Sequence, residues 1–148
     1  MSIALSRDHK PDERDEATRI LTAGGRIESY YDENENPLGP QRVWLQSENI
    51  PGLAMSRSVG DWVAESVGVM SDPEILEYSI NPDDKFIVLG SDGIFDFIKN
   101  EEVVKMVVPY WIRGDVNGAW AALGKEARKR WMKEEEVIDD ITCIVIFL

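Results

Sequence analysis

Aspartates at the ends of apolar runs are the side chains of this sequence best placed to do chemistry. The apolar run at residues 86–89 ends just before Asp92, and Asp96 follows four positions later. Asp139 and Asp140 directly precede a second apolar run at residues 141–148. Two or three aspartate oxygens, without His or Cys in support, select a hard cation such as Mg²⁺ or Mn²⁺. If the two runs are strands that pair, the acids meet at one end of a sheet and can hold such a cation.

The same acids also allow a purely structural interpretation. Aspartates are common in turns because their side chains accept hydrogen bonds from nearby backbone amides. From spacing alone, Asp92 and Asp139 could be turn or cap residues rather than ligands, and both interpretations stay open at this point.

Two more specific interpretations of the acids fail at positions that each of them requires. Asp32 opens a D-x-N-x-N pattern like that of a calcium loop, but the sixth position is Pro37 and the twelfth is Val43 instead of Gly and Glu. An aspartyl-phosphate enzyme of the haloacid dehalogenase type needs a nucleophilic Asp two residues before Asp92, where this chain has Gly90. We therefore interpret residues 31–41 as a polar surface loop and discard the aspartyl-phosphate chemistry.

The composition restricts the partners and the compartment. The chain has 148 residues and a formal net charge of −12, which argues against a nucleic-acid partner because phosphates require a basic face. Cys143 is the only cysteine, so no internal disulfide can form, which suits a reducing compartment. No stretch approaches the length needed to span a membrane, and the first residues are too short for a signal peptide. We expect a protein of the cytoplasm or nucleus.

The hydrophobic pattern predicts an α+β chain with antiparallel sheets. We expect helices at residues 11–25 and 100–107, the latter ended by Pro109, and a third helix whose apolar stripe runs from Val116 through Trp120 to Trp131. Strands are expected at residues 26–30, 42–46 and 141–148, and residues 74–80 and 85–90 read as a hairpin. The final strand should be buried, and the chain shows no domain linker.

The order of several motifs resembles the PPM-type, or type 2C, metal-dependent serine/threonine protein phosphatases. The motifs are RDHKPDERDEATRILTAGGRI, IPGLAMSRSVGD, SDPEI, FIVLGSDGIFDFIKNEEVV and DDITCIVIFL. The similarity covers essentially the whole chain, and LAMSRSVGD, SDGIFD and DDITCIV in this order and spacing are highly specific.

This resemblance implies a fold, a set of ligands and a flap. The fold is part of a β-sandwich, in which antiparallel sheets flanked by helices hold a two-metal centre of Mg²⁺ or Mn²⁺. Matched motif by motif, Asp92 and Asp139 are ligands of that centre, and Asp96 contributes to a third, weaker site. Asp140 stands where the family usually has Asn. The segment from Gly25 to Leu53 matches the mobile substrate flap.

Two flap residues, Arg42 and Trp44, are candidates for contact with substrates. Trp44 lies between proline-containing loops and has two interpretations: a core residue of the strand RVWLQ, or an aromatic side chain that contacts a partner. We also expect Asp61, in SVGD, to be structural rather than a metal ligand.

The resemblance further implies that residues 1–148 are the C-terminal portion of a single phosphatase domain. The family's DGHGG segment, which supplies a bridging Asp, does not occur in this chain. The implied activity is hydrolysis of phosphoserine and phosphothreonine on proteins by a water that the metals activate, with the missing N-terminal half of the domain as a partner. The alternative is a non-catalytic, phosphatase-like module that binds a partner.

Overall fold

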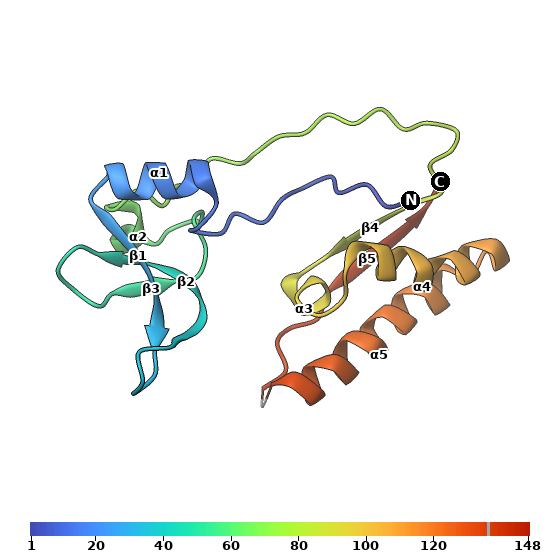
Figure 1. The fold of residues 1–148 in the computed structure, drawn as a ribbon. Coiled ribbons are helices and arrows are strands. Elements are labelled where there is room, and N and C mark those ends of the chain that lie inside the picture. The colour runs from blue at the N-terminus through green and yellow to red at the C-terminus, as the bar shows by residue number, and fades with distance from the viewer. Residues whose placement is uncertain (136) are drawn as a thin grey trace. The chain divides into compact units, whose positions relative to one another are not determined.

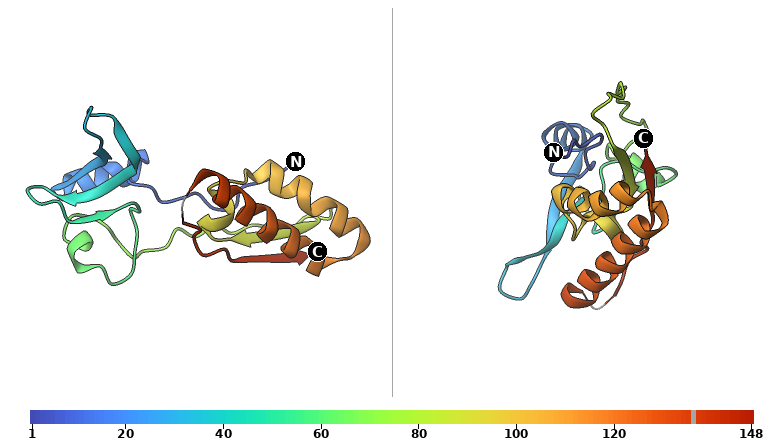
Figure 2. Two further views of the ribbon diagram at one scale, coloured as in Figure 1. Left: turned by 90° about the horizontal axis from the view of Figure 1, so that it is seen from below. Right: turned by 90° about the vertical axis from the view of Figure 1, so that its right-hand side faces the viewer.

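The chain folds into two compact units (Figures 1 and 2). The computed structural model describes residues 1–135 and 137–148. The N-terminal unit comprises Ser6–Leu76, and the C-terminal unit comprises Met1–Leu5 together with Glu77–Leu148. Each unit has its own hydrophobic core.

The N-terminal unit consists of a helix packed on a three-stranded antiparallel sheet. Helix α1 (Arg14–Thr22) precedes strands β1 (Gly25–Tyr31), β2 (Pro37–Leu45) and β3 (Pro51–Leu53), which pair in the order β1-β2-β3. The short helix α2 (Trp62–Glu65) follows. The core of this unit is aliphatic and consists of Ile20, Val43, Ala64, Val67 and Val69.

The expected polar loop at residues 31–41 is wrong in its second half, because β2 already begins at Pro37. Tyr31 pairs with Pro37 and Glu28 pairs with Arg42, and the register shifts between these pairs. The irregularity leaves Gly39, Pro40 and Gln41 opposite the single residue Ser29, and β3 pairs with β2 only at Val43 and Trp44, beyond both prolines. Prolines are tolerated at strand starts and bulges, where no ladder hydrogen bond is lost.

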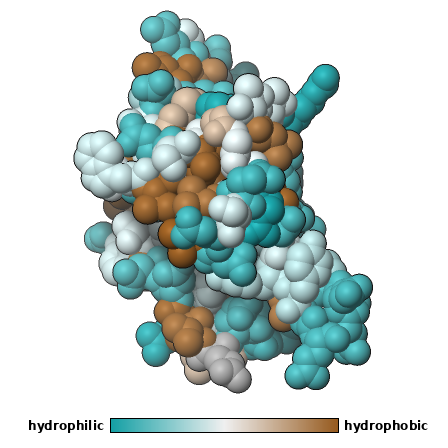
Figure 3. All heavy atoms as spheres, turned by 90° about the vertical axis from the view of Figure 1, so that its left-hand side faces the viewer, coloured by the Kyte–Doolittle hydropathy of each residue, from teal (hydrophilic) through white to brown (hydrophobic). Residues whose placement is uncertain are grey.

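The expected structural role of Asp61 agrees with its position. Asp61 precedes α2 and its carboxylate accepts a hydrogen bond from Ala64 N at 3.0 Å, as an N-cap residue does. The surface near this helix is apolar as well as polar: Val59 is 90% exposed and Trp62 is 79% exposed. Figure 3 shows one face of the molecule, with apolar groups in brown among hydrophilic ones.

The C-terminal unit is a two-stranded antiparallel sheet covered by helices on one face (Figure 1). Strand β4 (Phe86–Gly90) pairs with β5 (Cys143–Phe147), and between them lie α3 (Asp92–Phe95), α4 (Asn100–Arg113) and α5 (Val116–Glu134). The buried core comprises Ile94, Ile98, Val103, Val107, Ala119, Leu123, Ala127 and Val145. Alternate strand residues, such as Val88 and Phe147, pack against this core.

The other face of this sheet is exposed. Leu89 and Ile144 are paired across the strands and are 53% and 54% exposed. The expectation that residues 141–148 form a fully buried strand is therefore wrong: β5 is buried on one face only, as the period of two along a strand allows.

The expected hairpin of residues 74–80 with β4 is also wrong. Residues 71–80 carry no strand, and β4 pairs with β5, more than fifty positions later in the chain. The alternating apolar residues at 74–80 suggested a strand, but pattern alone does not determine which segment pairs with which.

Helix boundaries differ from the expectation in two places. Helix α4 continues through Pro109 and ends at Gly114, whose φ of 67° is the left-handed conformation that favours glycine at this position. In α5, the buried stripe consists of Ala119, Leu123 and Ala127, while Trp120 is exposed. The predicted α+β class with antiparallel sheets is confirmed. No helix among residues 1–135 and 137–148 is both long and apolar enough to cross a membrane.

Candidate metal centre

Strands β4 and β5 bring the two candidate aspartate segments to the same end of their sheet. The last pair of the ladder joins Gly90 to Cys143. Asp92 follows β4 after one intervening residue, and Asp139 and Asp140 precede β5. The strand pairing assumed for a metal site therefore exists, with both acidic segments beyond its final pair.

Ser91 fastens the two segments together. Its amide donates a hydrogen bond to Thr142 O at 2.9 Å, and its hydroxyl donates to Asp140 O at 3.0 Å. The same hydroxyl oxygen accepts a hydrogen bond from Thr142 N at 3.2 Å. Three hydrogen bonds thus hold the turn that carries Asp92 against the loop that carries Asp139.

Gly93 allows this close approach because it has no side chain. A Cβ at this position would lie 2.4 Å from Asp140 O and 3.1 Å from Ile141 Cα. Both of these are backbone atoms, which cannot rotate away. Position 93 of the Ser91-Asp92-Gly93 turn therefore requires glycine, because a larger residue would push the two acidic segments apart.

The two candidate ligands are exposed and are held in similar ways. Asp92 accepts a hydrogen bond from Gly93 N at 2.9 Å, and Asp139 accepts one from Asp140 N at 2.7 Å, each through Oδ1. Among the described residues, the second oxygen of each carboxylate accepts no hydrogen bond. These oxygens are the ones open to a cation.

Apolar and aromatic side chains behind the site fix the turn. Trp131 Nε1 donates a hydrogen bond to Gly93 O at 2.8 Å, and the Trp131 ring meets Phe97 edge to face, with centroids 4.7 Å apart. Arg130 donates to Phe97 O at 2.6 Å and also pairs with Glu102 and Glu126. Hydrogen bonds from Arg130 hold the pKa of both glutamates below the usual value.

Asp96 lies one helical turn beyond Asp92. It is the C-cap residue of α3, and its amide donates a hydrogen bond to Asp92 O at 2.9 Å. Residues four apart on a helix share a face, so the third candidate acid lies on the same side of this turn as Asp92.

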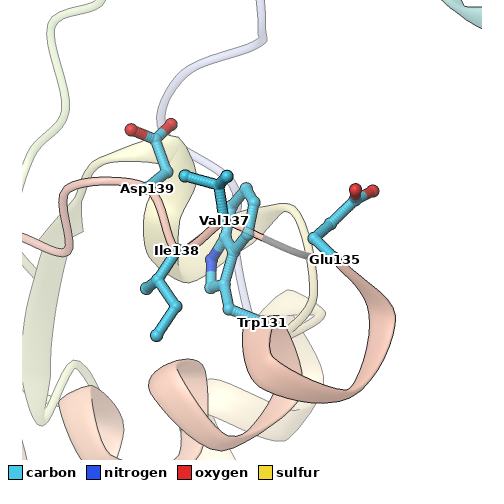
Figure 4. A pocket seen from close by; sticks show the side chains of 5 residues that line it. All are labelled: Trp131, Glu135, Val137, Ile138 and Asp139. Carbon is cyan, nitrogen blue, oxygen red and sulfur yellow. The ribbon is translucent and has the colours of Figure 1, made fainter.

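A surface hollow of about 530 Å³ opens beside Asp139 (Figure 4). It is lined by Trp131, Glu135, Val137, Ile138 and Asp139. Within residues 1–135 and 137–148, no group of three or more His, Cys, Asp or Glu side chains is arranged to hold a metal ion.

The two candidate flap residues lie in the N-terminal unit, on one face of the β1–β2 hairpin. Trp44 is 5% exposed, donates through Nε1 to Glu28 O at 2.9 Å and meets Tyr30 edge to face. This burial agrees with the core interpretation of Trp44. Arg42 stacks over the Tyr30 ring at 5.1 Å and donates to Gly52 O at 2.7 Å. Contact of either residue with a substrate stays a prediction.

A buried ionic cluster around Glu16 was not anticipated. Glu16 is fully buried in α1 and accepts hydrogen bonds from Arg19 at 2.6 Å, Ser56 at 2.5 Å and Arg57 at 2.5 Å. Burial acts to raise the pKa of Glu16, but these hydrogen bonds outweigh it and hold that pKa well below its usual range. The spacing of Glu16 and Arg19 is visible in the sequence, whereas Ser56 and Arg57 lie forty positions away.

Comparisons with known proteins agree with this architecture. The family model for protein phosphatase 2C matches residues 1–128, which include Asp92 and Asp96 but not Asp139. Two Arabidopsis thaliana proteins, probable protein phosphatases 2C 72 and 2C 35, are 39% and 36% identical over 99% and 96% of this chain.

The chain spans less than half the length of each of these relatives. It corresponds to 43% and 44% of the two Arabidopsis proteins. A crystal structure of serine-threonine phosphatase 2C from Toxoplasma gondii has a TM-score of 0.80 at 22% identity, over 97% of this chain and 46% of that one. This likeness confirms the fold, and the extent of the matches is consistent with part of a domain. The chain belongs to the protein phosphatase 2C family.

Proposed function

We propose that this chain is the C-terminal portion of the catalytic domain of a metal-dependent protein serine/threonine phosphatase. The reaction is hydrolysis of phosphoserine and phosphothreonine on proteins. The observation that carries the proposal is the fastening of the Asp92 turn to the Asp139 loop by Ser91 and Gly93. Family membership supplies the reaction class.

The donor set fits Mg²⁺ or Mn²⁺. Asp92 and Asp139 each have one oxygen oriented by a backbone amide and a second oxygen open to a ligand. Carboxylates without His or Cys suit hard cations, with waters completing the coordination. Asp92 and Asp139 hold part of a two-metal centre in this proposal, and Asp96 contributes to a third, weaker position.

When bound, two such cations would lower the pKa of a water molecule and offset charge on the phosphoryl oxygens. This chain's residues have the task of positioning. Ser91 and Gly93 keep the acids at a fixed separation, and Trp131 holds the turn from behind. No nucleophilic Ser, Cys or His is needed from this chain.

The remaining ligands come, in this proposal, from a part of the domain outside these 148 residues. Two or three aspartates do not complete a two-metal centre, and the chain spans 44% of a relative such as probable protein phosphatase 2C 35. The β1–β2 hairpin, with Arg42, serves as the flap beside phosphoprotein substrates.

Substitution of the two acids tests the proposal. In a domain completed with an N-terminal half, Asp92→Asn and Asp139→Asn keep the shape but remove the charge. We expect each variant to lose Mn²⁺ affinity, measured by calorimetry, and to lose phosphatase activity by orders of magnitude. Asp83→Asn, an exposed acid of the same unit, is the matched control and should behave like the wild type.

Asp96→Asn gives a graded comparison. It should retain Mn²⁺ better than either of the other variants and show its effect mainly in turnover, because it belongs to the weaker site. Full activity of both Asp92→Asn and Asp139→Asn would contradict the assignment. Such a result would favour a partner-binding module without catalysis.

A further inference from the structure

Arg42, on the β1–β2 hairpin (Figure 1), carries a positive charge that its acidic neighbour does not offset. Arg42 lies opposite Glu28 in the strand ladder, but the Glu28 carboxylate accepts a hydrogen bond from Arg26. Among residues 1–135 and 137–148, Arg42 forms no ion pair with Asp or Glu. The charge of Arg42 is therefore available to an anion from outside the chain.

The guanidinium group of Arg42 is held in one orientation. Its Nη1 donates a hydrogen bond to Gly52 O at 2.7 Å, and its Cζ lies 5.1 Å from the centroid of the Tyr30 ring. The Tyr30 ring in turn meets the buried Trp44 edge to face, with centroids 5.3 Å apart. Because the side chain is already ordered, Arg42 loses little conformational entropy when it binds a ligand.

Two hydrogen-bond donors beside Gly52 have no acceptor in the part of the chain that the structure describes. One is Nη2 of Arg42, and the other is the hydroxyl group of Tyr30, a residue that is 52% exposed. The two side chains meet at Gly52, because Arg42 donates to Gly52 O and a Cβ added at Gly52 would lie 3.3 Å from Tyr30 Oη. In addition, Nε of Arg42 is shielded from solvent and has no partner, which costs free energy.

These donors match the chemistry of an oxyanion. A carboxylate or phosphate oxygen accepts hydrogen bonds from guanidinium and phenol groups and offsets the positive charge. Because the charge is delocalised over the guanidinium group, an anion at Nη2 also lowers the electrostatic cost of the buried Nε. A basic ligand would be repelled by Arg42, and an apolar ligand would remove water from the guanidinium without replacing its interactions.

We propose that Arg42 and the Tyr30 hydroxyl form an oxyanion-binding site on the β1–β2 hairpin. The site selects phosphoproteins that carry an acidic side chain, or a second phosphate group, in the segment around the phosphosite. The inference rests on the proposed phosphatase function, in which this hairpin is the substrate flap, and it names the substrate class. The oxyanion bound here is not the phosphate that is hydrolysed, which belongs to the metal centre.

Peptide turnover tests the inference. The domain completed with an N-terminal half is assayed on phosphothreonine peptides in which one neighbouring position at a time carries Asp or Ala. We expect kcat/KM at one position to be about 2- to 5-fold higher for Asp than for Ala, as for an exposed ion pair, and Arg42→Gln to remove this preference. The readout is the ratio of the two peptides, so a general loss of activity does not affect it. A wild-type ratio of one at every position would overturn the inference.

Tyr30→Phe and Arg14→Gln are the comparison variants. Tyr30→Phe removes only the hydroxyl group and keeps the ring that stacks on Arg42, so it should weaken the preference for Asp without loss of stability. Arg14→Gln removes the same charge from an exposed residue of α1 and should keep the preference. An equal loss in Arg42→Gln and Arg14→Gln would contradict the site, since only net charge would then act. A full preference in Tyr30→Phe would contradict it even if Arg42→Gln does not fold.

A binding measurement separates this inference from the proposed function and identifies the oxyanion. Peptides that lack the phosphothreonine and carry Ala, Asp or phosphoserine at the neighbouring positions are titrated into the metal-free completed domain, with amide chemical shifts of the hairpin as the readout. Tighter binding of the Asp or phosphoserine peptide that Arg42→Gln abolishes supports the site even if no phosphatase activity is found, and the tighter of the two identifies the source of the oxyanion. Equal binding of all three peptides contradicts the site even if the enzyme is active.

Discussion

Gly93 lies so close to the backbone of Asp140 that a residue with a side chain does not fit at position 93. An added Cβ would stand 2.4 Å from Asp140 O. At Gly124, inside α5, an added Cβ would meet no atom of the described residues within 4 Å. The two glycines therefore give a matched pair of sites for the same substitution.

Gly93→Ala should separate the Asp92 turn from the Asp139 loop. We expect a loss of Mn²⁺ affinity of at least tenfold in the completed domain, together with reduced stability. Gly124→Ala should instead stabilise α5 by about 0.5–1 kcal/mol, because Ala has the higher helix propensity. Calorimetric Mn²⁺ titration and thermal unfolding measure both. Wild-type metal affinity in Gly93→Ala would show that the contact does not position the acids.

Glu16 gives a second prediction for a single residue. Glu16→Gln leaves Arg19 and Arg57 without their shared buried anion, and because both guanidinium groups are partly exposed we expect a loss of about 1–3 kcal/mol. Urea unfolding at pH 7 should show this loss. Thr18→Ser, on an exposed part of the same helix, is a mild control.

The pH dependence of the Glu16 contribution has a definite sign. Its pKa in the folded protein lies below that of the unfolded chain, so its stabilising contribution is complete above about pH 4.5 and is lost as the pH falls below that value. Wild-type stability should fall more steeply with acid than that of Glu16→Gln. Parallel pH profiles of the two proteins would contradict this account.

At the scale of elements, strand β2 belongs both to the core of the N-terminal unit, through Val43, and to the proposed flap. Trp44 is on the face opposite Val43, yet it is buried because Tyr30, Arg26 and the backbone of Gly52 cover it. A Cβ at Gly52 would lie 2.8 Å from the Trp44 ring, so glycine at 52 leaves room for the indole.

Trp44→Ala distinguishes a packing role from a substrate role. Loss of a buried Trp costs about 3–5 kcal/mol, so we expect a large drop in the stability of the N-terminal unit. Chemical unfolding followed by circular dichroism measures the drop. Unchanged stability with altered activity on protein substrates would instead indicate that Trp44 contacts the substrate.

The elements also show where prediction from sequence succeeds. The helix near residues 14–22 and the acids at the ends of β4 and β5 could be predicted, because residues that start or stop a helix and runs of apolar residues are visible locally in the sequence. The site required β4 to pair with β5, and the structure has this pairing. The predicted hairpin of β4 with residues 74–80 was wrong, because an alternating apolar pattern does not specify which strand is the partner. Pro37 and Pro40 concealed half of β2, because a bulge can accept residues that usually mark loops.

Interactions across long separations in the chain could not be predicted. Ser91 bonds to Asp140 O and Thr142 N about fifty positions away, and Trp131 bonds to Gly93 O. None of these contacts has a local signal in the sequence. They are the contacts that convert two acidic segments into a candidate site.

At the scale of the whole molecule, the C-terminal unit leaves apolar sheet surface open. Leu89, Ile144 and Ile146 are exposed on the face of β4–β5 opposite the helices. Exposed aliphatic surface on a two-stranded sheet favours self-association through its edges and its open face. We therefore expect the isolated chain to be oligomeric or poorly soluble, which size-exclusion chromatography with light scattering can measure; a stable monomer over a wide concentration range would contradict this expectation.

The central claim is that this chain contributes one part of a metal centre whose other ligands lie outside it. The direct test is to assay Mn²⁺-dependent phosphate release from a phosphoserine peptide by the 148-residue chain, first alone and then with a complementary N-terminal half of the domain. The account predicts no turnover by the chain alone and turnover in the reconstituted pair, abolished by chelator. Robust turnover by the chain alone, as a folded monomer, would contradict it.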